Sequence, residues 1–479
     1  MKKRIRNYEF RIKKTELRMQ NSGEGIKRDE LGIMKIFRRS LSLLLVYCLM
    51  LIVHCSLYAS DPIPAPKQNH PIALIGGTIH PVSGPEISKG IILFENGKIS
   101  GIGTSITLPA NVEKIDATGK HIYPGLINAN STLGLTEISA VRATNDYTET
   151  GRVNPNVRSE IAINPESELI PTTRANGVII AHVLPQGGLI AGRSAAIIMD
   201  GWTQEDVVLK APVGLVVYWP RMTISRGAFV RQSEEDQKKD REKQLKELRD
   251  AFDDARAYMV AKKGESAKGI PYHASDMRWE SMIPVLERKI PVYVYAAEIQ
   301  QIEAAVRWAK DENIRLVVVG GRDSWRAADL LKANDVAVIV GPTLDEPTRR
   351  WEPYDEAFTV AAKLYTAGVQ FAISGEGEAM AERNTPYHAA MAAAYGLPKE
   401  EALKAVTLNA AKILDIDANV GSLEVGKDAS LFVTNGDPLE ISTNVELEFI
   451  QGRRIDLRSR HTILYNKYLE KYKQLGILK

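Results

Sequence analysis

An alternation of strands and helices through the second half of the chain limits the folds that this sequence can adopt. Four short apolar runs rich in valine and isoleucine recur there, at residues 290–295, 314–319, 336–340 and 369–373. The segment after the first run has the apolar spacing of one helical face, at Ile302, Ala305, Val306 and Ala309. Strands joined by helices pair in parallel, so this order predicts an α/β fold. Over residues 124–418 it fits a closed (β/α)8 TIM-type barrel.

Short strands with tight turns flank the alternating region on both sides. Residues 72–123 contain Asn96-Gly97 between two apolar runs. This pair is a strong hairpin signal, because both turn positions need a positive φ. Residues 419–456 return to short strands and contain a second Asn-Gly pair. We therefore expect a small antiparallel unit before the barrel and more β structure after it.

Two segments outside the strands have the character of surface helices. Residues 233–260 form a charged insertion with one apolar stripe and a capping-box sequence at its start. We expect a solvated helix packed by one face, with a lid or a partner surface as the alternative. Residues 457–479 form a tyrosine-rich helix, and we expect its stripe to pack against the barrel rather than to line a ligand site.

The first 59 residues have the pattern of a secretory leader. Basic residues precede an apolar run at 41–53, which is short for a membrane span, and a small residue ends the segment. We expect a signal peptide, with an uncleaved anchor as the alternative, and a true start near Met34. Both cysteines, Cys48 and Cys55, lie in this leader, so the mature chain has no disulfide. The protein is expected to be exported, either periplasmic or secreted, with residues 60–71 as a proline-rich linker.

Composition and charge exclude several classes of protein. An apolar share of 44% is far too high for a disordered chain. The formal net charge of +3 depends on the basic leader, and the remainder of the chain is net acidic. This balance argues against a nucleic-acid partner and against an anionic membrane surface. Membrane contact is therefore expected only through the signal peptide.

Several segments, in order and spacing, resemble the amidohydrolase superfamily and in particular its imidazolonepropionase-like members. They are residues 95–99 (ENGKI), 115–120 (IDATGK), 124–127 (PGLI), 396–403 (GLPKEEAL) with 407–409 (TLN), and 421–429 (GSLEVGKDA). The resemblance implies a (β/α)8 barrel flanked by a small β-sandwich domain built from the N- and C-terminal segments. It also implies hydrolysis of a C–N bond by one or two divalent metals at the carboxyl ends of the strands.

The metal ligands that this resemblance implies are replaced here. Asn130 and Thr132 hold the positions of the His-x-His pair after the first strand. Val216 lies in the region of the bridging lysine, and Tyr295 and Gly320 hold two later histidine positions. Amide, hydroxyl and phenol oxygens are poor replacements for imidazoles on a zinc-like ion. We therefore expect no metal ligand set and no metal cofactor.

One carboxylate survives, because Glu376 follows the last barrel strand where relatives carry a catalytic aspartate. Two functions remain open. The favoured one is an exported protein whose hydrolase centre is lost, acting as a binding module or as a companion subunit of a catalytically complete relative, or as a homo-oligomer. The alternative is an active hydrolase of C–N bonds in non-peptide or dipeptide substrates, with an atypical site at Glu376 and a divalent metal such as zinc.

Other titratable residues near the strand ends have simpler interpretations. His182 lies late in a predicted strand, and we expect it to be a hydrogen-bonded strand histidine. Glu298 and Asp323 follow neighbouring strands, where carboxylates commonly cap helices. We expect these two to be solvated or capping residues rather than a catalytic pair.

Overall fold

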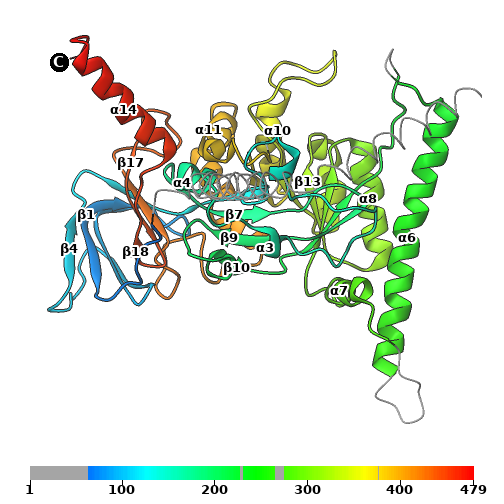
Figure 1. Ribbon diagram of the computed structural model, residues 1–479, viewed down its shortest axis with the longest axis horizontal. Helices are drawn as coiled ribbons and strands as arrows, with labels where there is room; N and C mark the ends of the chain where they lie inside the picture. The colour runs from blue at the N-terminus through cyan, green and yellow to red at the C-terminus, as the bar shows by residue number, and fades with distance from the viewer. Residues whose placement is uncertain (1–62, 227–229, 265–273, 376, 479) are drawn as a thin grey trace, which may run out of the picture. The chain divides into compact units, whose positions relative to one another are not determined.

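The computed structural model describes residues 63–226, 230–264, 274–375 and 377–478 (Figure 1). The predicted leader and Glu376 lie outside these residues. Within the described residues, no helix combines the length and the apolar character needed to span a bilayer.

Both ends of the described chain meet in one eight-stranded sheet. Its order is β18-β17-β16-β5-β1-β2-β3, and β4 also pairs with β1. The strands are β1 (Ile72–Ile79), β2 (Ile87–Glu95), β3 (Lys98–Gly103), β4 (Glu113–Asp116), β5 (His121–Pro124), β16 (Leu431–Thr434), β17 (Val445–Ile450) and β18 (Arg453–Arg454). The predicted hairpin joins β2 to β3, and Asn96 and Gly97 have φ of 53° and 79°. Antiparallel pairing of β5 with β16 joins the N-terminal strands to the C-terminal ones.

The barrel strands form two further sheets. Their orders are β10-β9-β7-β6 and β15-β14-β13-β12-β11-β8. The strands are β6 (Leu126–Ser131), β7 (Val178–Val183), β8 (Ile190–Arg193), β9 (Ala195–Ile198), β10 (Val208–Lys210), β11 (Leu215–Tyr218), β12 (Val292–Ala296), β13 (Leu316–Gly320), β14 (Ala337–Val340) and β15 (Phe371–Ile373). The five strands from β11 to β15 pair in parallel, as the alternation predicts.

One strand departs from the strict β/α order. Only Ser194 separates β8 from β9, and the two pair antiparallel with β11 and β7 respectively. This continuous segment therefore joins the two barrel sheets. At the other side β15 lies beside β6, although the described residues form no hydrogen-bonded ladder there. The architecture is the expected α/β barrel type with a small β domain, and it includes one reversed strand.

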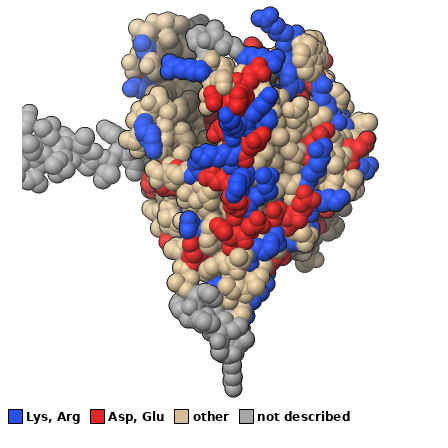
Figure 2. Space-filling model, turned by 90° about the vertical axis from the view of Figure 1, so that its right-hand side faces the viewer, with Lys and Arg blue, Asp and Glu red and all other residues tan. Residues whose placement is uncertain are grey.

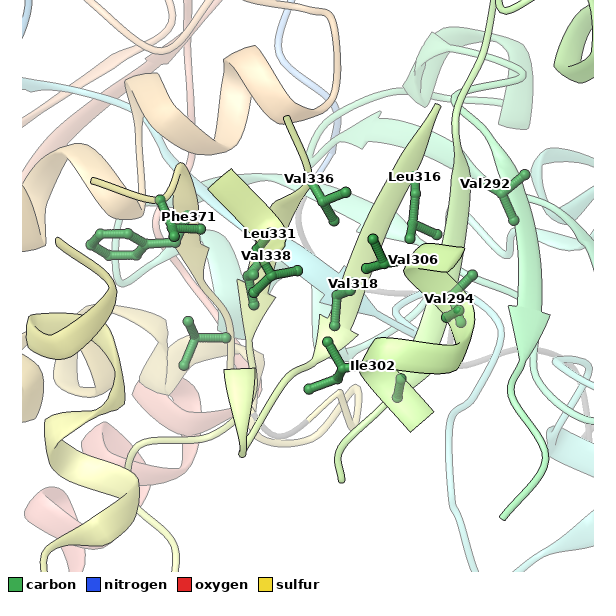
Figure 3. Packing of buried hydrophobic residues seen from close by; sticks show 14 of the residues in the cluster. Val292, Val294, Ile302, Val306, Leu316, Val318, Leu331, Val336, Val338 and Phe371 are labelled. Carbon is green, nitrogen blue, oxygen red and sulfur yellow. The ribbon is translucent and has the colours of Figure 1, made fainter. Parts of the chain in front are cut away.

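Alternating side chains of the barrel strands build two apolar layers. One layer faces the helices, where Val292, Val294, Leu316 and Val318 pack against Ile302 and Val306 of α8 (Ile299–Glu312), as Figure 3 shows. The other layer includes Val216, Tyr293, Val317, Val319 and Ile339 from the same strands. All four residues of the predicted helical face of α8 are buried, because each stands at helical spacing over this sheet.

The remaining helices surround these sheets. They are η1 (Arg142–Thr144), α3 (Ser159–Ala162), α4 (Leu169–Arg174), α5 (Gln204–Val207), α6 (Glu234–Gly264), α7 (Met277–Leu286), η2 (Ser324–Ala327), α9 (Ala328–Ala333), α10 (Glu356–Ala367), η3 (Glu382–Asn384), α11 (Thr385–Ala394), α12 (Lys399–Ala405), α13 (Leu408–Ile413) and α14 (Arg460–Gln474). The predicted charged insertion is α6, and it buries one face through Leu248, Ala251, Phe252 and Ala255. The surface on this side of the molecule is a mosaic of acidic and basic side chains (Figure 2).

An ion cluster joins the linker, the barrel and the small β domain. The Asp200 carboxylate accepts from Arg174 Nη1 at 2.9 Å and pairs with Arg453 Nη1 at 2.8 Å. It also accepts from the backbone amide of Ala65 at 3.2 Å. The side chains of Asp200 and Arg174 are almost fully buried. Each charge of this pair is therefore compensated without help from water.

The prediction for the C-terminal helix was wrong in one respect. The helix forms as α14, and the Ser459 hydroxyl caps it by accepting from Thr462 N. None of its residues is buried, so its tyrosine stripe does not pack against the barrel.

Candidate functional site

The candidate residues lie at different depths near the carboxyl ends of the barrel strands. Strand register pairs Tyr218 with Tyr295, and Ala296 with Gly320, so Tyr295 and Gly320 lie near one edge. Val216 lies two residues deeper on β11, fully buried in the apolar layer. The described residues thus bring Asn130, Thr132 and Tyr295 toward the site, whereas Val216 and Gly320 supply no polar side chain.

Tyr295 and Asn130 are directly bonded to each other. The Tyr295 hydroxyl donates to Asn130 Oδ1 at 2.6 Å. The Tyr218 ring stacks on the Tyr295 ring with 4.4 Å between centroids and 6° between planes. Burial raises the pKa of both phenols far above the ordinary value of 10. Tyr295 therefore stays neutral at physiological pH, with its proton committed to the amide oxygen of Asn130.

The segment after β15 packs onto the end of β6. The Thr132 hydroxyl donates to the carbonyl oxygen of Gly377 at 3.3 Å. Gly377 has a φ of +75°, and a Cβ at this position would lie 2.9 Å from Asn130 Nδ2. A side chain at residue 377 would therefore collide with Asn130. Glu376, the candidate catalytic residue, precedes this glycine and lies outside the described residues.

A buried carboxyl group that the sequence did not indicate lies beside these residues. Glu382 belongs to η3, and its Oε2 accepts from Asn128 Nδ2. The residue is 1% exposed, and its Oε1 has no hydrogen-bond partner among the described residues. Burial raises the pKa of Glu382 well above its usual value, while a hydrogen bond from Ser131 lowers it. Burial therefore favours the protonated, neutral form of this carboxyl group.

A second buried group, His388 of α11, lies near the same strand ends. Its Nδ1 accepts from the backbone amides of Thr343 and Leu344 at 3.2 and 3.3 Å, which places the ring proton on Nε2. Nε2 has no partner within the described part of the chain. It lies 3.8 Å from the place of a Cβ on Gly375, and Asn128 Nδ2 lies 3.6 Å from that place. Burial lowers the pKa of His388 to about 4, so the imidazole is neutral.

Sequence reasoning missed Glu382 and His388 as members of the site. Neither residue stands at a position where the resemblance places a ligand. Both come after β15, the last strand of the barrel, along the chain. The sequence offered only two indications of a role, namely that these side chains are titratable and that they follow β15. Their burial depends on the packing of η3 and α11, which a local pattern does not encode.

The simpler expectations for three other residues are confirmed. His182 bonds through both ring nitrogens, to Ala129 O at 2.9 Å and to the Ser194 hydroxyl at 2.7 Å. Burial lowers its pKa to about 3. Glu298 caps α8, and Asp323 accepts from the amide of Ile299 while forming an ion pair with Arg349. These carboxylates therefore have structural partners.

Comparison with known proteins agrees with this architecture. The family model of the amidohydrolase family matches residues 267–455. A solved amidohydrolase from Thermotoga maritima MSB8 is 28% identical, with a TM-score of 0.72, over 81% of this chain and 100% of that chain. The sequence match and the shared fold support placing the chain in the amidohydrolase superfamily.

Two more distant relatives extend the comparison. The amidohydrolase tasK of Hapsidospora irregularis is 20% identical over 391 residues, which are 76% of this chain. This chain spans only 39% of the length of that relative. The solved structure of molinate hydrolase is 17% identical, covers 81% of this chain and 95% of its own, and has a TM-score of 0.50. At this identity the likeness concerns the fold alone.

The donor set at the site does not fit the divalent metal that membership of this superfamily implies. The amide oxygen of Asn130 already accepts from a neutral phenol, and the Thr132 hydroxyl donates to a carbonyl. Val216 and Gly320 offer no donor atom. Among the described residues, no three histidine, cysteine or acidic side chains gather in a metal-binding arrangement. Zinc and related ions need several imidazole, thiolate or carboxylate ligands, which these positions do not provide.

Proposed function

We propose that this amidohydrolase-superfamily protein has lost its metal-dependent hydrolase centre and acts as an exported binding module or companion subunit. The hydrogen bond from Tyr295 to Asn130 carries this proposal. In catalytic members, by the sequence resemblance, imidazoles occupy both positions and bind metal. Here the hydroxyl of Tyr295 and the side-chain oxygen of Asn130 form a hydrogen bond with each other.

The electrostatics of the neighbouring groups support the same proposal. A divalent cation is stabilised by anionic ligands, and it lowers the pKa values of nearby acids. The only described carboxyl group bonded within this cluster is Glu382, which is 1% exposed and accepts from the Asn128 amide. The described polar side chains here are amides, phenols, one imidazole and a single buried carboxyl group, which offer a divalent cation few anionic ligands.

Export and partnership are the remaining parts of the proposal. The leader over residues 1–59 supports export to the periplasm or the medium. The retained fold without its ligand set supports a binding role. We propose either a catalytically complete relative or a second copy of this chain as the partner, with no nucleic acid involved.

Metal analysis and activity assays of the same preparation test the proposal. We expect far less than one zinc per chain after incubation with zinc and removal of free metal. We also expect no hydrolysis of N-acyl amino acids or dipeptides. Stoichiometric zinc, together with hydrolysis that Glu376→Gln abolishes, would overturn the proposal in favour of the hydrolase alternative. Glu149→Gln, at an exposed glutamate, is the matched control.

A further inference from the structure

The C-terminal helix α14 presents an unpartnered amphipathic surface. Figure 1 shows it extending outward from the β-strands toward the C-terminus. Its first turn lies near α4, and Arg383 Nη1 bonds His461 Nδ1 at 3.1 Å. Beyond this anchor its large side chains are open to solvent, with Tyr465 68% and Leu475 61% exposed.

All the apolar side chains of α14 except Ile463, together with its C-cap Leu475, form one continuous surface. At 3.6 residues per turn, they fall within an arc of about 140°. We name this surface the tyrosine arc, and it consists of Leu464, Tyr465, Tyr468, Leu469, Tyr472 and Leu475. The exposed Ile477 and Leu478 follow directly after the helix. Contiguous exposed apolar patches commonly mark interaction sites.

Basic residues border the tyrosine arc on both sides. Lys471 lies along one border and Lys473 along the other, with Lys467 next to Lys471. Glu470 is the only acidic residue of the helix, and it lies on the opposite face. The three lysines pair with no carboxylate among the described residues.

We propose that α14 binds the surface of a membrane that contains anionic lipid. A helix lying in the interface buries its apolar arc at the headgroup level while flanking lysines extend to the phosphates. Tyrosine suits this depth because its ring is apolar and its hydroxyl reaches water. Three of the six residues of the arc are tyrosines.

The same charges disfavour a second copy of the chain as the occupant. If two α14 helices paired through their tyrosine arcs, the bordering lysines of both copies would come together. With one glutamate per helix, and that on the opposite face, no acid would compensate them. An anionic lipid surface instead attracts each lysine. The lysines of α14 thus make this helix locally basic, whereas the net acidic charge of the chain after the leader predicted no contact with an anionic membrane surface.

Sedimentation of the full chain with lipid vesicles tests the proposal. We expect binding to vesicles of phosphatidylcholine and phosphatidylglycerol at 3:1, and much weaker binding to pure phosphatidylcholine. Each lysine near an anionic surface contributes about fivefold in affinity. Lys467→Gln/Lys471→Gln/Lys473→Gln should therefore weaken binding by about a hundredfold, and added salt should do the same.

A matched pair of variants tests the tyrosine arc. Tyr468→Ser/Tyr472→Ser should abolish binding through α14, whereas Asn466→Ser/Gln474→Ser on the polar face should leave it unchanged. Since α14 has no buried residue, all these variants should keep the melting temperature of the parent protein. The comparison separates loss of the surface from loss of the fold.

Peptide-resolved hydrogen exchange separates α14 from the apolar leader, which could bind lipid by itself. We expect the backbone amides of residues 460–478 to exchange at least tenfold more slowly when the 3:1 vesicles are present. Unchanged exchange there would overturn the proposal, even if the protein sediments. Protection of these amides that increases with protein concentration in the absence of lipid would also overturn the proposal, because it would indicate pairing with a second copy of the chain.

Discussion

The neutral state of Glu382 leads to a prediction that separates a metal-free site from a metal-binding one. Glu382→Gln replaces the carboxyl group by an amide of the same shape, which can still accept from Asn128. In the folded protein the wild-type side chain stays protonated well above its unfolded pKa, because it is 1% exposed. The unfolded chain releases that proton when the pH rises above about 4.5.

The sign and size of the effect follow from this difference in bound protons. A group whose pKa is raised by folding contributes stability that is present at low pH and is lost as the pH rises. One proton retained by the folded state costs about 1.4 kcal/mol per pH unit above the unfolded pKa. The glutamine variant does not carry this cost. Its stability relative to wild type should thus change little below about pH 4.5 and rise above it, with a limiting slope of about 1.4 kcal/mol per pH unit while the wild-type group stays protonated.

Denaturant unfolding of both proteins at several pH values between 4 and 7 measures this difference. Taking the difference cancels the opposite contribution of His182 and His388, whose lowered pKa values are common to both proteins. Glu149→Gln, on the surface, should show no such slope. A flat difference, or a glutamine variant less stable than wild type at pH 7, would refute the reasoning. Either result would mean that folding does not hold the proton of Glu382 above its unfolded pKa.

Three further predictions concern the surrounding contacts. Asp200→Ala leaves two arginines without their buried partner, so it should lower the unfolding free energy by about 3–5 kcal/mol, measured by denaturant titration. Gly377→Ala should lower the unfolding free energy more than Gly119→Ala in the same assay. Both glycines have a positive φ, which costs alanine about 1–2 kcal/mol, but only a Cβ at residue 377 would collide with Asn130. Equal losses of stability would contradict the packing described. Tyr295→Phe leaves the Asn130 oxygen unpaired and should cost about 1–3 kcal/mol without changing bound zinc in metal analysis.

Local patterns predicted the parts of the fold that depend on neighbours in sequence. The helical face of α8 and the turn at Asn96-Gly97 form as expected, because spacing and backbone preference determine them. The reversed direction of β8–β9 was not predicted, since a strand carries no local signal for the direction of its partner. The barrel type could be predicted, but this exception could not.

The candidate site was predictable only where the resemblance placed a residue. Asn130, Thr132 and Tyr295 were singled out as replaced ligands. In the structure Tyr295 donates to Asn130, and Thr132 donates to the backbone of Gly377. Glu382 was not singled out, because its chemistry depends on being buried by segments far apart in sequence. The tyrosine stripe of α14 could be predicted from the sequence, but its exposure could not. Helical periodicity identifies an apolar face but does not determine what that face contacts.

The bond between Ala65 and Asp200 limits how far the chain can be shortened from its N-terminal side without loss of a contact. If the segment over residues 1–59 is removed as proposed, a cut before Ala65 keeps the amide that completes the buried cluster. A cut further along would leave the Asp200 carboxylate with its two arginines but without this backbone donor. A cut upstream of residue 65 would therefore leave intact the contact between this first described segment and the barrel.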